Sequence, residues 1–189
     1  MPQNQIKKHT VNLKESLYLL HPYNTCLITA KDRNDQINVM AVAWIIPVNV
    51  DPPLIAMSIR PERYSYPMIQ ERGEFVVNIP TFTQTRDVLF CGRRSGRNTN
   101  KFQNTHYTTQ EARKVNVPII NECIAHLECK VEETIPLKDH DLIIGKIFSA
   151  YALEGYFTKL YDIEKHQPCL HVGKNTFTTC LKEILEPKL

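Results

Sequence analysis

Runs of apolar and β-branched residues, separated by short polar turns, occupy much of the first 151 residues. Such runs are typical of strands, and turn residues between them indicate a largely antiparallel sheet or barrel. The polar residues 31–36 predict the first turn, and Asp51-Pro52-Pro53 ends a long second run. We predict strands over residues 25–30, 38–50, 54–59, 74–79, 124–135 and 142–151.

Two short helices are predicted between these strands. The first begins near Tyr66-Pro67 and ends at Gly73, because proline is tolerated in a first helical turn and glycine often follows the last. The second covers residues 83–91, begins at a threonine that would cap it and closes at Gly92.

The two ends of the chain carry weaker patterns. Residues 1–20 predict a polar lead-in with a short helix, and residues 162–189 predict a loop, one strand and a terminal helix or tail. The chain has 189 residues and no internal repeat, so we expect a single domain over residues 1–189. The predicted class is mainly β with helical insertions, or α+β.

The composition of the chain argues against several classes of function. Hydrophobic content of 42% and charged content of 23% are ordinary for a globular protein, and a net charge of +3 is too small for a nucleic-acid binder. No segment approaches the ~18 consecutive apolar residues of a membrane span, and residues 1–14 lack the apolar core of a signal peptide. We therefore expect a cytoplasmic protein whose six scattered cysteines are free thiols.

The segment after the strand at residues 54–59 is a candidate phosphate site. Arg60, Arg63 and Ser65 lie close to the predicted helix start. Unpaired N–H groups at a helix start attract anions, and arginine adds a forked, charged donor. The alternative is that Ser65 only caps the helix and the arginines are solvated. The spacing alone leaves both interpretations open.

A glycine- and arginine-rich loop follows the second predicted helix. Glycine permits close backbone approach to a ligand, and the loop carries several cations, so it can close over a phosphorylated cofactor. Many such loops are only solvent-exposed turns. The loop is neither a Walker sequence nor a GxGxxG turn, so triphosphate and Rossmann binding are not supported. Its charged residues are Arg93, Arg94, Arg97 and Lys101.

A histidine and the single tryptophan are further candidates for a catalytic or ligand-binding site. His140 lies between Asp139 and Asp141, where it can donate or accept protons, although a surface turn is the simpler interpretation. Trp44 is either a core residue or one wall of a pocket for a flat ligand.

Cys123, His126 and Cys129 have the residue types of a metal site. On a strand the two cysteines share a face about 20 Å apart at ~3.3 Å per residue, and the histidine points to the other face. Because zinc ligands lie ~2.0–2.3 Å from the metal, no metal site is predicted.

The order and spacing of these segments resemble the flavin reductase-like, FMN-binding split-barrel family, and within it the flavoredoxins. The resemblance extends over roughly residues 25–177 and implies a Greek-key antiparallel split barrel that binds FMN as a homodimer. Asn98 and Asn100 depart from the aspartates that relatives often carry and leave the loop more basic. The segments that carry the resemblance are residues 38–44, 51–60, 64–66, 73–78, 91–102, 127–129 and 139–145.

The resemblance also implies roles for individual residues. Residues near the isoalloxazine would come from segment 38–44, and the phosphate would lie at the helix start and the basic loop. His140 is in addition the expected catalytic residue. The implied cofactor-binding residues are Asn38, Val42, Ala43, Trp44, Arg60, Tyr64, Ser65, Ser95, Arg97, Lys101, His140 and Phe177.

The implied activity is that of an oxidoreductase that transfers electrons through FMN from a reduced nicotinamide or a protein donor to an acceptor. Alternatives are an NAD(P)H-dependent flavin or ferric reductase, a non-catalytic FMN carrier, and a ligand-free interaction barrel. The sequence does not choose among them.

Overall fold

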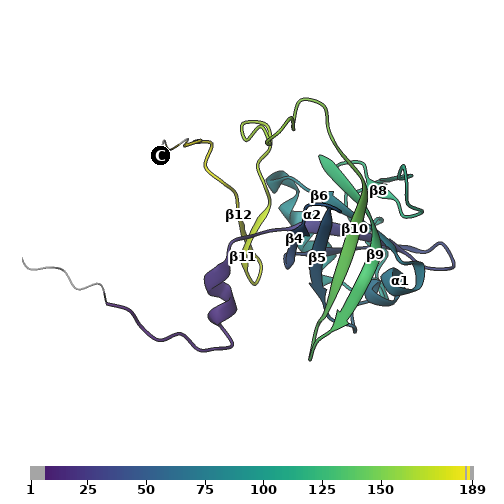
Figure 1. Ribbon diagram of the computed structural model, residues 1–189, viewed down its shortest axis with the longest axis horizontal. Helices are drawn as coiled ribbons and strands as arrows, with labels where there is room; N and C mark the ends of the chain where they lie inside the picture. Colours follow the sequence, from purple (N-terminus) through teal and green to yellow (C-terminus); the bar gives the residue numbers. More distant parts are fainter. Residues whose placement is uncertain (1–6, 186, 188–189) are drawn as a thin grey trace, which may run out of the picture.

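A seven-stranded antiparallel sheet forms the body of the protein in the computed structural model, which describes residues 7–185 and 187. The strand order is β3-β2-β6-β9-β10-β5-β4. The neighbouring strands β9, β10, β5 and β4 can be followed in Figure 1. The prediction of a mainly β protein with a few short helices is confirmed. The strands are β2 (Cys26–Lys31), β3 (Ile37–Val42), β4 (Ile45–Asn49), β5 (Leu54–Ile59), β6 (Glu74–Ile79), β9 (Ala125–Pro136) and β10 (Asp141–Ala152).

The predicted strand over residues 38–50 is wrong as a single element. The run divides into β3 and β4, which lie at opposite ends of the strand order, and Ala43 and Trp44 cross between them. The Trp44 carbonyl accepts a hydrogen bond from the Ser58 N–H at 2.9 Å. The residues on both sides of the crossing are apolar, so the run contains no polar break where the chain changes its partner strand.

Helix α1 (Ser65–Arg72) ends as predicted. Gly73 has a left-handed φ of 68°, and its N–H donates to the Ile69 carbonyl. Helix α2 (Thr85–Arg93) differs from its prediction because the capping threonine is Thr81, which caps the 3₁₀ turn η2 (Phe82–Gln84) ahead of it. Gly92 lies inside α2 and does not end it.

A smaller three-stranded sheet, β1-β11-β12, stands beside the main sheet (Figure 1). Its C-terminal hairpin corrects the expected single strand, because two strands form within residues 162–189. Of the expected terminal helix or tail, the described residues after β12 form no helix. The described chain contains no helix long and apolar enough to cross a membrane. The remaining elements are β1 (Tyr23–Asn24), β7 (Thr109–Gln110), β8 (Ile119–Ile120), β11 (Leu170–Gly173), β12 (Thr176–Thr178) and the 3₁₀ helix η1 (Ser16–Leu20).

Buried polar groups tie the strands together behind the apolar core. The Asn78 Oδ1 accepts a hydrogen bond from the Ile120 N–H and lies 2.9 Å from His126 Nδ1. Because burial lowers the pKa of His126 to about 4, its ring is neutral near pH 7. Cys123 lies just before β9, not on it, and the residues described here contain no cluster of metal-ligating side chains. All six cysteines are free, and five are buried.

Candidate functional site

A cleft of about 590 Å³ lies among β3, the β5–α1 loop, α2, the basic loop after α2 and the β11–β12 hairpin. The fold thus gathers residues that lie up to 159 positions apart in the chain, from Tyr18 to Phe177. All the predicted site residues line this cleft: Asn38, Val42, Ala43, Trp44, Arg60, Tyr64, Ser65, Ser95, Arg97, Lys101, His140 and Phe177.

The cleft floor joins strand β3 to the start of α1. The buried Asn38 Nδ2 donates a hydrogen bond to Ser65 Oγ at 2.7 Å. Ser65 is therefore not a helix cap, because the N-cap position is Tyr64 and no side-chain capping bond forms there. The Ser65 hydroxyl keeps its own hydrogen for donation to another group.

The basic loop lies directly on this floor because residue 96 is glycine. A Cβ at Gly96 would clash with Asn38 Oδ1 and Tyr64 Cδ1 and would lie 2.8 Å from Asn38 Cγ. Arg97 Nη1 donates to the Glu62 carbonyl at 3.0 Å, and the guanidinium lies 5.7 Å from the centre of the Tyr64 ring. The two basic segments predicted from the sequence therefore meet at the start of α1.

Lys101 has contacts that the sequence did not predict. Its side chain is buried, and Nζ donates to the carbonyls of Val39 at 2.6 Å and Cys91 at 2.7 Å. Burial lowers the pKa of Lys101 to about 8. The side chain therefore clamps β3 to α2, and a direct contact between Lys101 and a phosphate stays a prediction.

His140 also lines the cleft and lies against Trp44, with ring centres 5.1 Å apart. Arg60 Nε donates to His140 Nε2 at 3.4 Å, so the imidazole proton sits on Nδ1, which lies 3.2 Å from Asp139 Oδ1. The expectation that carboxylates on both sides would act on His140 is wrong for Asp141. The Asp141 carboxylate accepts a hydrogen bond from the Tyr66 hydroxyl instead.

The β11–β12 hairpin supplies the wall that carries Phe177. The Phe177 and His171 ring centres are 5.4 Å apart, and His171 Nε2 lies 3.1 Å from the Lys174 carbonyl. Arg93 of α2 donates to the same carbonyl at 2.5 Å and fastens the hairpin turn to the helix. Sequence reasoning missed several residues that line the cleft, among them Tyr18, Thr25, His171 and Lys174.

The donor set of this cleft fits a planar, phosphorylated ligand such as FMN. Trp44 and Phe177 offer aromatic surfaces, while arginines and the Ser65 hydroxyl offer donors for a phosphate. The volume lies within the ~300–1,000 Å³ typical of small-molecule sites. The one lining thiol, Cys91, does not act as a nucleophile, because burial raises its pKa to about 12.

Comparisons with known proteins agree with this interpretation. The family model described as "Flavin reductase like domain" matches residues 18–171. An uncharacterized protein of Archaeoglobus fulgidus is 36% identical over 184 residues, with 96% of this chain and 100% of that protein covered. A flavin reductase of Pseudomonas putida is 28% identical over 127 residues, with 67% of this chain and 71% of that protein covered.

Solved structures show the same fold. The flavoredoxin from Methanosarcina acetivorans superposes with a TM-score of 0.85 at 27% identity, covering 96% of this chain and 95% of that one. The flavoredoxin of Desulfovibrio vulgaris (Miyazaki F) gives a TM-score of 0.80 at 26% identity, covering 98% and 97%. The predicted split-barrel fold and the resemblance that implied it are confirmed.

Proposed function

Because this chain belongs to the flavin reductase-like domain family, we propose that it binds FMN in the cleft and transfers electrons through it. The donor would be a reduced nicotinamide or a redox protein. The observation that carries the proposal is the meeting of the aromatic wall, the start of α1 and the basic loop in one cleft. The expected cytoplasmic location of the protein stays a prediction.

The phosphate of FMN would be held at the start of α1. Arg60 and Arg97 supply charge-assisted donors there, Ser65 supplies a hydroxyl, and Tyr64 packs under the Arg97 guanidinium. The ring system would lie toward Trp44 and the backbone of residues 42–44, which line the same cleft.

FMN supplies the electron chemistry when bound, and the protein supplies binding, orientation and electrostatics. Arg60 and Asp139 hold the His140 imidazole in one orientation, with the proton on Nδ1. We propose that His140 donates or accepts a proton within the cleft, in keeping with the catalytic role that the family resemblance implied for it.

We further propose a homodimer that contacts through strand β4. Ile46 and Val48 of β4 and the residues that flank it, Trp44 and Val50, form a stripe along this edge strand, and each is between 40% and 90% exposed. A second copy would bury this stripe, and because Trp44 also lines the cleft, the interface would adjoin the flavin. Light scattering tests this proposal, since a monomer that binds FMN fully would contradict it.

Reconstitution with excess FMN tests the function itself. The proposed function predicts flavin absorption bands in the desalted protein and oxidation of NADH or NADPH, or of a reduced redox protein, in the presence of an acceptor. Flavin retention without turnover by any of these donors would indicate a carrier. Absence of flavin would leave only the ligand-free barrel.

A further inference from the structure

Helix α1 begins with three consecutive residues whose side chains reach three different segments. Tyr64 packs against the basic loop, and Ser65 accepts the hydrogen bond from Asn38 on β3. The Tyr66 hydroxyl donates to the carboxylate of Asp141, the first residue of β10. Of these three described residues, Tyr64 and Ser65 line the cleft and Tyr66 does not. The role of the Tyr66 hydroxyl therefore lies in what it does to Asp141.

Asp141 directly follows His140 at the end of a long hairpin. Strands β9 and β10 each have 12 residues, and the turn between them is closed by a bond of 3.0 Å from the Leu137 N–H to the His140 carbonyl. The end of a hairpin moves unless contacts with the rest of the fold hold it. Asp141 is only 9% exposed, and in the described parts of the chain the Tyr66 hydroxyl is the one side-chain donor to its carboxylate. Tyr66 thus fixes the residue next to His140.

The other groups that face His140 hold it less firmly. Arg60 Nε lies 3.4 Å from His140 Nε2, and Asp139 Oδ1 lies 3.2 Å from Nδ1. The Arg60 and Asp139 side chains are 52% and 70% exposed, and contacts between solvent-exposed charges contribute little to stability. Trp44 adds a ring contact that carries no charge. The part-buried link through Tyr66 is therefore the firmest side-chain anchor for this end of the hairpin.

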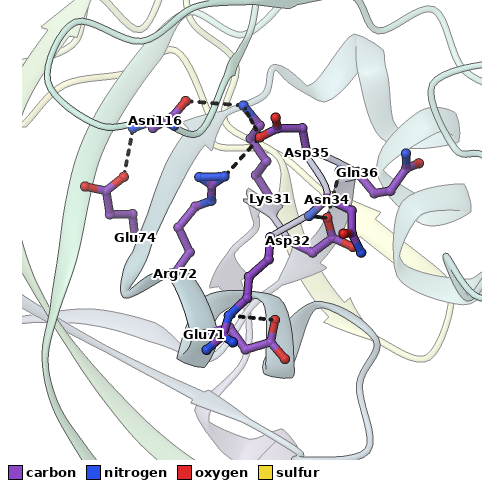
Figure 2. Close-up of polar contacts among 10 residues, drawn as sticks. Lys31, Asp32, Asn34, Asp35, Gln36, Glu71, Arg72, Glu74 and Asn116 are labelled. Atoms are coloured by element: carbon purple, nitrogen blue, oxygen red, sulfur yellow. Dashed lines mark hydrogen bonds and ion pairs between the residues drawn. The ribbon is translucent and has the colours of Figure 1, made fainter.

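Helix α1 is itself held at both ends. Its first turn is bonded to β3 through Ser65, and at its last turn Arg72 donates to Asp35 of the β2–β3 turn at 3.0 Å (Figure 2). The carboxylate of Glu71 lies 3.9 Å from Arg33 of the same turn. The middle of the helix is fixed by packing, because Met68 and Ile69 are buried in the apolar core. The helix is therefore a firm support for a bond that positions another segment.

A second bond joins α1 to the same hairpin and provides a comparison. Gln70 Nε2 donates to Thr134 Oγ1 of β9 at 3.0 Å, and both side chains are exposed. Gln70 follows Tyr66 by four residues, so the two lie on one face of the helix. Thr134 pairs with Ile143, three residues beyond His140. The bond from Gln70 thus holds the hairpin without reaching the cleft.

We propose that Tyr66 is a positioning residue, which through Asp141 holds His140 at a fixed place relative to the phosphate site at the start of α1. The proposal rests on the proposed function, because His140 would exchange a proton beside bound FMN. One turn of helix would then set the positions of both the phosphate and the imidazole. Such precision matters, since a displacement of about 1 Å in a site can slow a reaction on the order of 10²-fold.

The test is Tyr66→Phe, which removes the hydroxyl and keeps the ring that packs against the apolar core. FMN affinity should stay near that of the unmodified protein, because the Tyr66 side chain does not line the cleft. Turnover by the FMN-loaded protein should fall on the order of tenfold. The double variant Tyr66→Phe/His140→Ala should be no slower than His140→Ala, because both changes act through the same imidazole.

A measurement on the flavin-free protein separates this proposal from the proposed function. The NMR ring resonances of His140, identified by their absence in His140→Ala, are followed from about pH 5 to pH 9. The bond with Asp141 raises the pKa of Tyr66 to about 12, so the link persists over this range in the unmodified protein. Tyr66→Phe is expected to shift or broaden these resonances. Failure of the chain to bind FMN would remove the proposed function and leave this readout intact.

Gln70→Ala is the matched control, because it removes the other bond between α1 and the hairpin. Its turnover and its His140 resonances should match those of the unmodified protein. If Tyr66→Phe does not fold, Tyr66→Phe/Asp141→Asn takes its place, since a neutral amide costs less than a carboxylate to leave without a partner. Its reference is Asp141→Asn, which keeps an oxygen that accepts from the Tyr66 hydroxyl.

Three outcomes would overturn the positioning role. One is a Tyr66→Phe variant whose His140 resonances coincide with those of the unmodified protein. Another is a double variant slower than His140→Ala by the full factor that Tyr66→Phe causes alone, which would show an effect independent of His140. The third is a loss of FMN affinity in Tyr66→Phe as large as its loss of turnover, which would make Tyr66 a binding residue.

Discussion

Gly96 is the position where one added methyl group most directly tests the geometry of the cleft. The clash of a Cβ there with Asn38 and Tyr64 is steric, since the position has no left-handed φ. Carbon atoms in favourable contact lie about 3.5–4.0 Å apart, so a Cβ 2.8 Å from Asn38 Cγ requires a shift of about 1 Å.

Neither neighbour can move away without breaking other contacts. Asn38 is buried and donates to Ser65, and Tyr64 is the N-cap residue of α1. The loop itself must therefore lift, and Arg97 would move away from the start of α1. Overpacking of this kind costs about 1–3 kcal/mol, and loss of a hydrogen bond to a charged group costs about 1.5–3 kcal/mol.

Gly96→Ala is accordingly expected to weaken FMN binding by roughly 10- to 100-fold, which corresponds to about 1.4–2.8 kcal/mol. Riboflavin, which lacks the phosphate, should lose less affinity. Fluorescence titrations with both flavins measure the two changes and their ratio.

Gly92→Ala is the matched control. A Cβ at Gly92 meets only the Ala41 Cβ, at 3.3 Å, which a shift of a few tenths of an ångström relieves, and alanine is favoured over glycine inside a helix such as α2. Its FMN affinity and melting temperature should stay near those of the unmodified protein. If Gly96→Ala binds FMN with unchanged affinity and an unchanged preference over riboflavin, the basic loop does not belong to the phosphate site.

Three further variants test other parts of the structure. Lys101→Met should weaken FMN and riboflavin equally, because the side chain clamps β3 to α2; a loss confined to FMN would show a phosphate contact instead. His140→Ala should lower the flavin midpoint potential or slow turnover with a smaller effect on affinity; redox and rate measurements that match the unmodified protein from about pH 5 to pH 9 would remove it from the site. His126 has its pKa lowered to about 4 by burial, so the unfolded chain binds its proton more readily; stability to urea should fall by about 3 kcal/mol as the pH drops from about 6.5 to 4, and His126→Gln should flatten this dependence.

Most of the sheet was predictable because apolar runs and turn residues are local signals. The runs at residues 54–59 and 74–79 coincide with β5 and β6, and Gly73 ends α1 where its left-handed φ is needed. The division of the run at residues 38–50 was not predictable, because a change of partner strand depends on the closure of the whole sheet and leaves no polar break.

The residues that line the site were predictable from the sequence, but the contacts that they make were not. The order of motifs indicated which residues gather in the cleft. Two details depend on tertiary distances: the bonds from Lys101 to two carbonyls, and the turn of Asp141 toward Tyr66. The hairpin wall was missed because residues 162–189 have mixed character and its strands are only four and three residues long.

Flavin binding by the purified protein tests directly whether the cleft is a flavin site. After reconstitution and desalting, we expect about one FMN per chain, with FMN bound on the order of 10²-fold more tightly than riboflavin because two charged donors meet its phosphate. No retained flavin after incubation with excess FMN would contradict the claim that this cleft is a flavin site, and equal affinities for the two flavins would contradict the phosphate site at the start of α1.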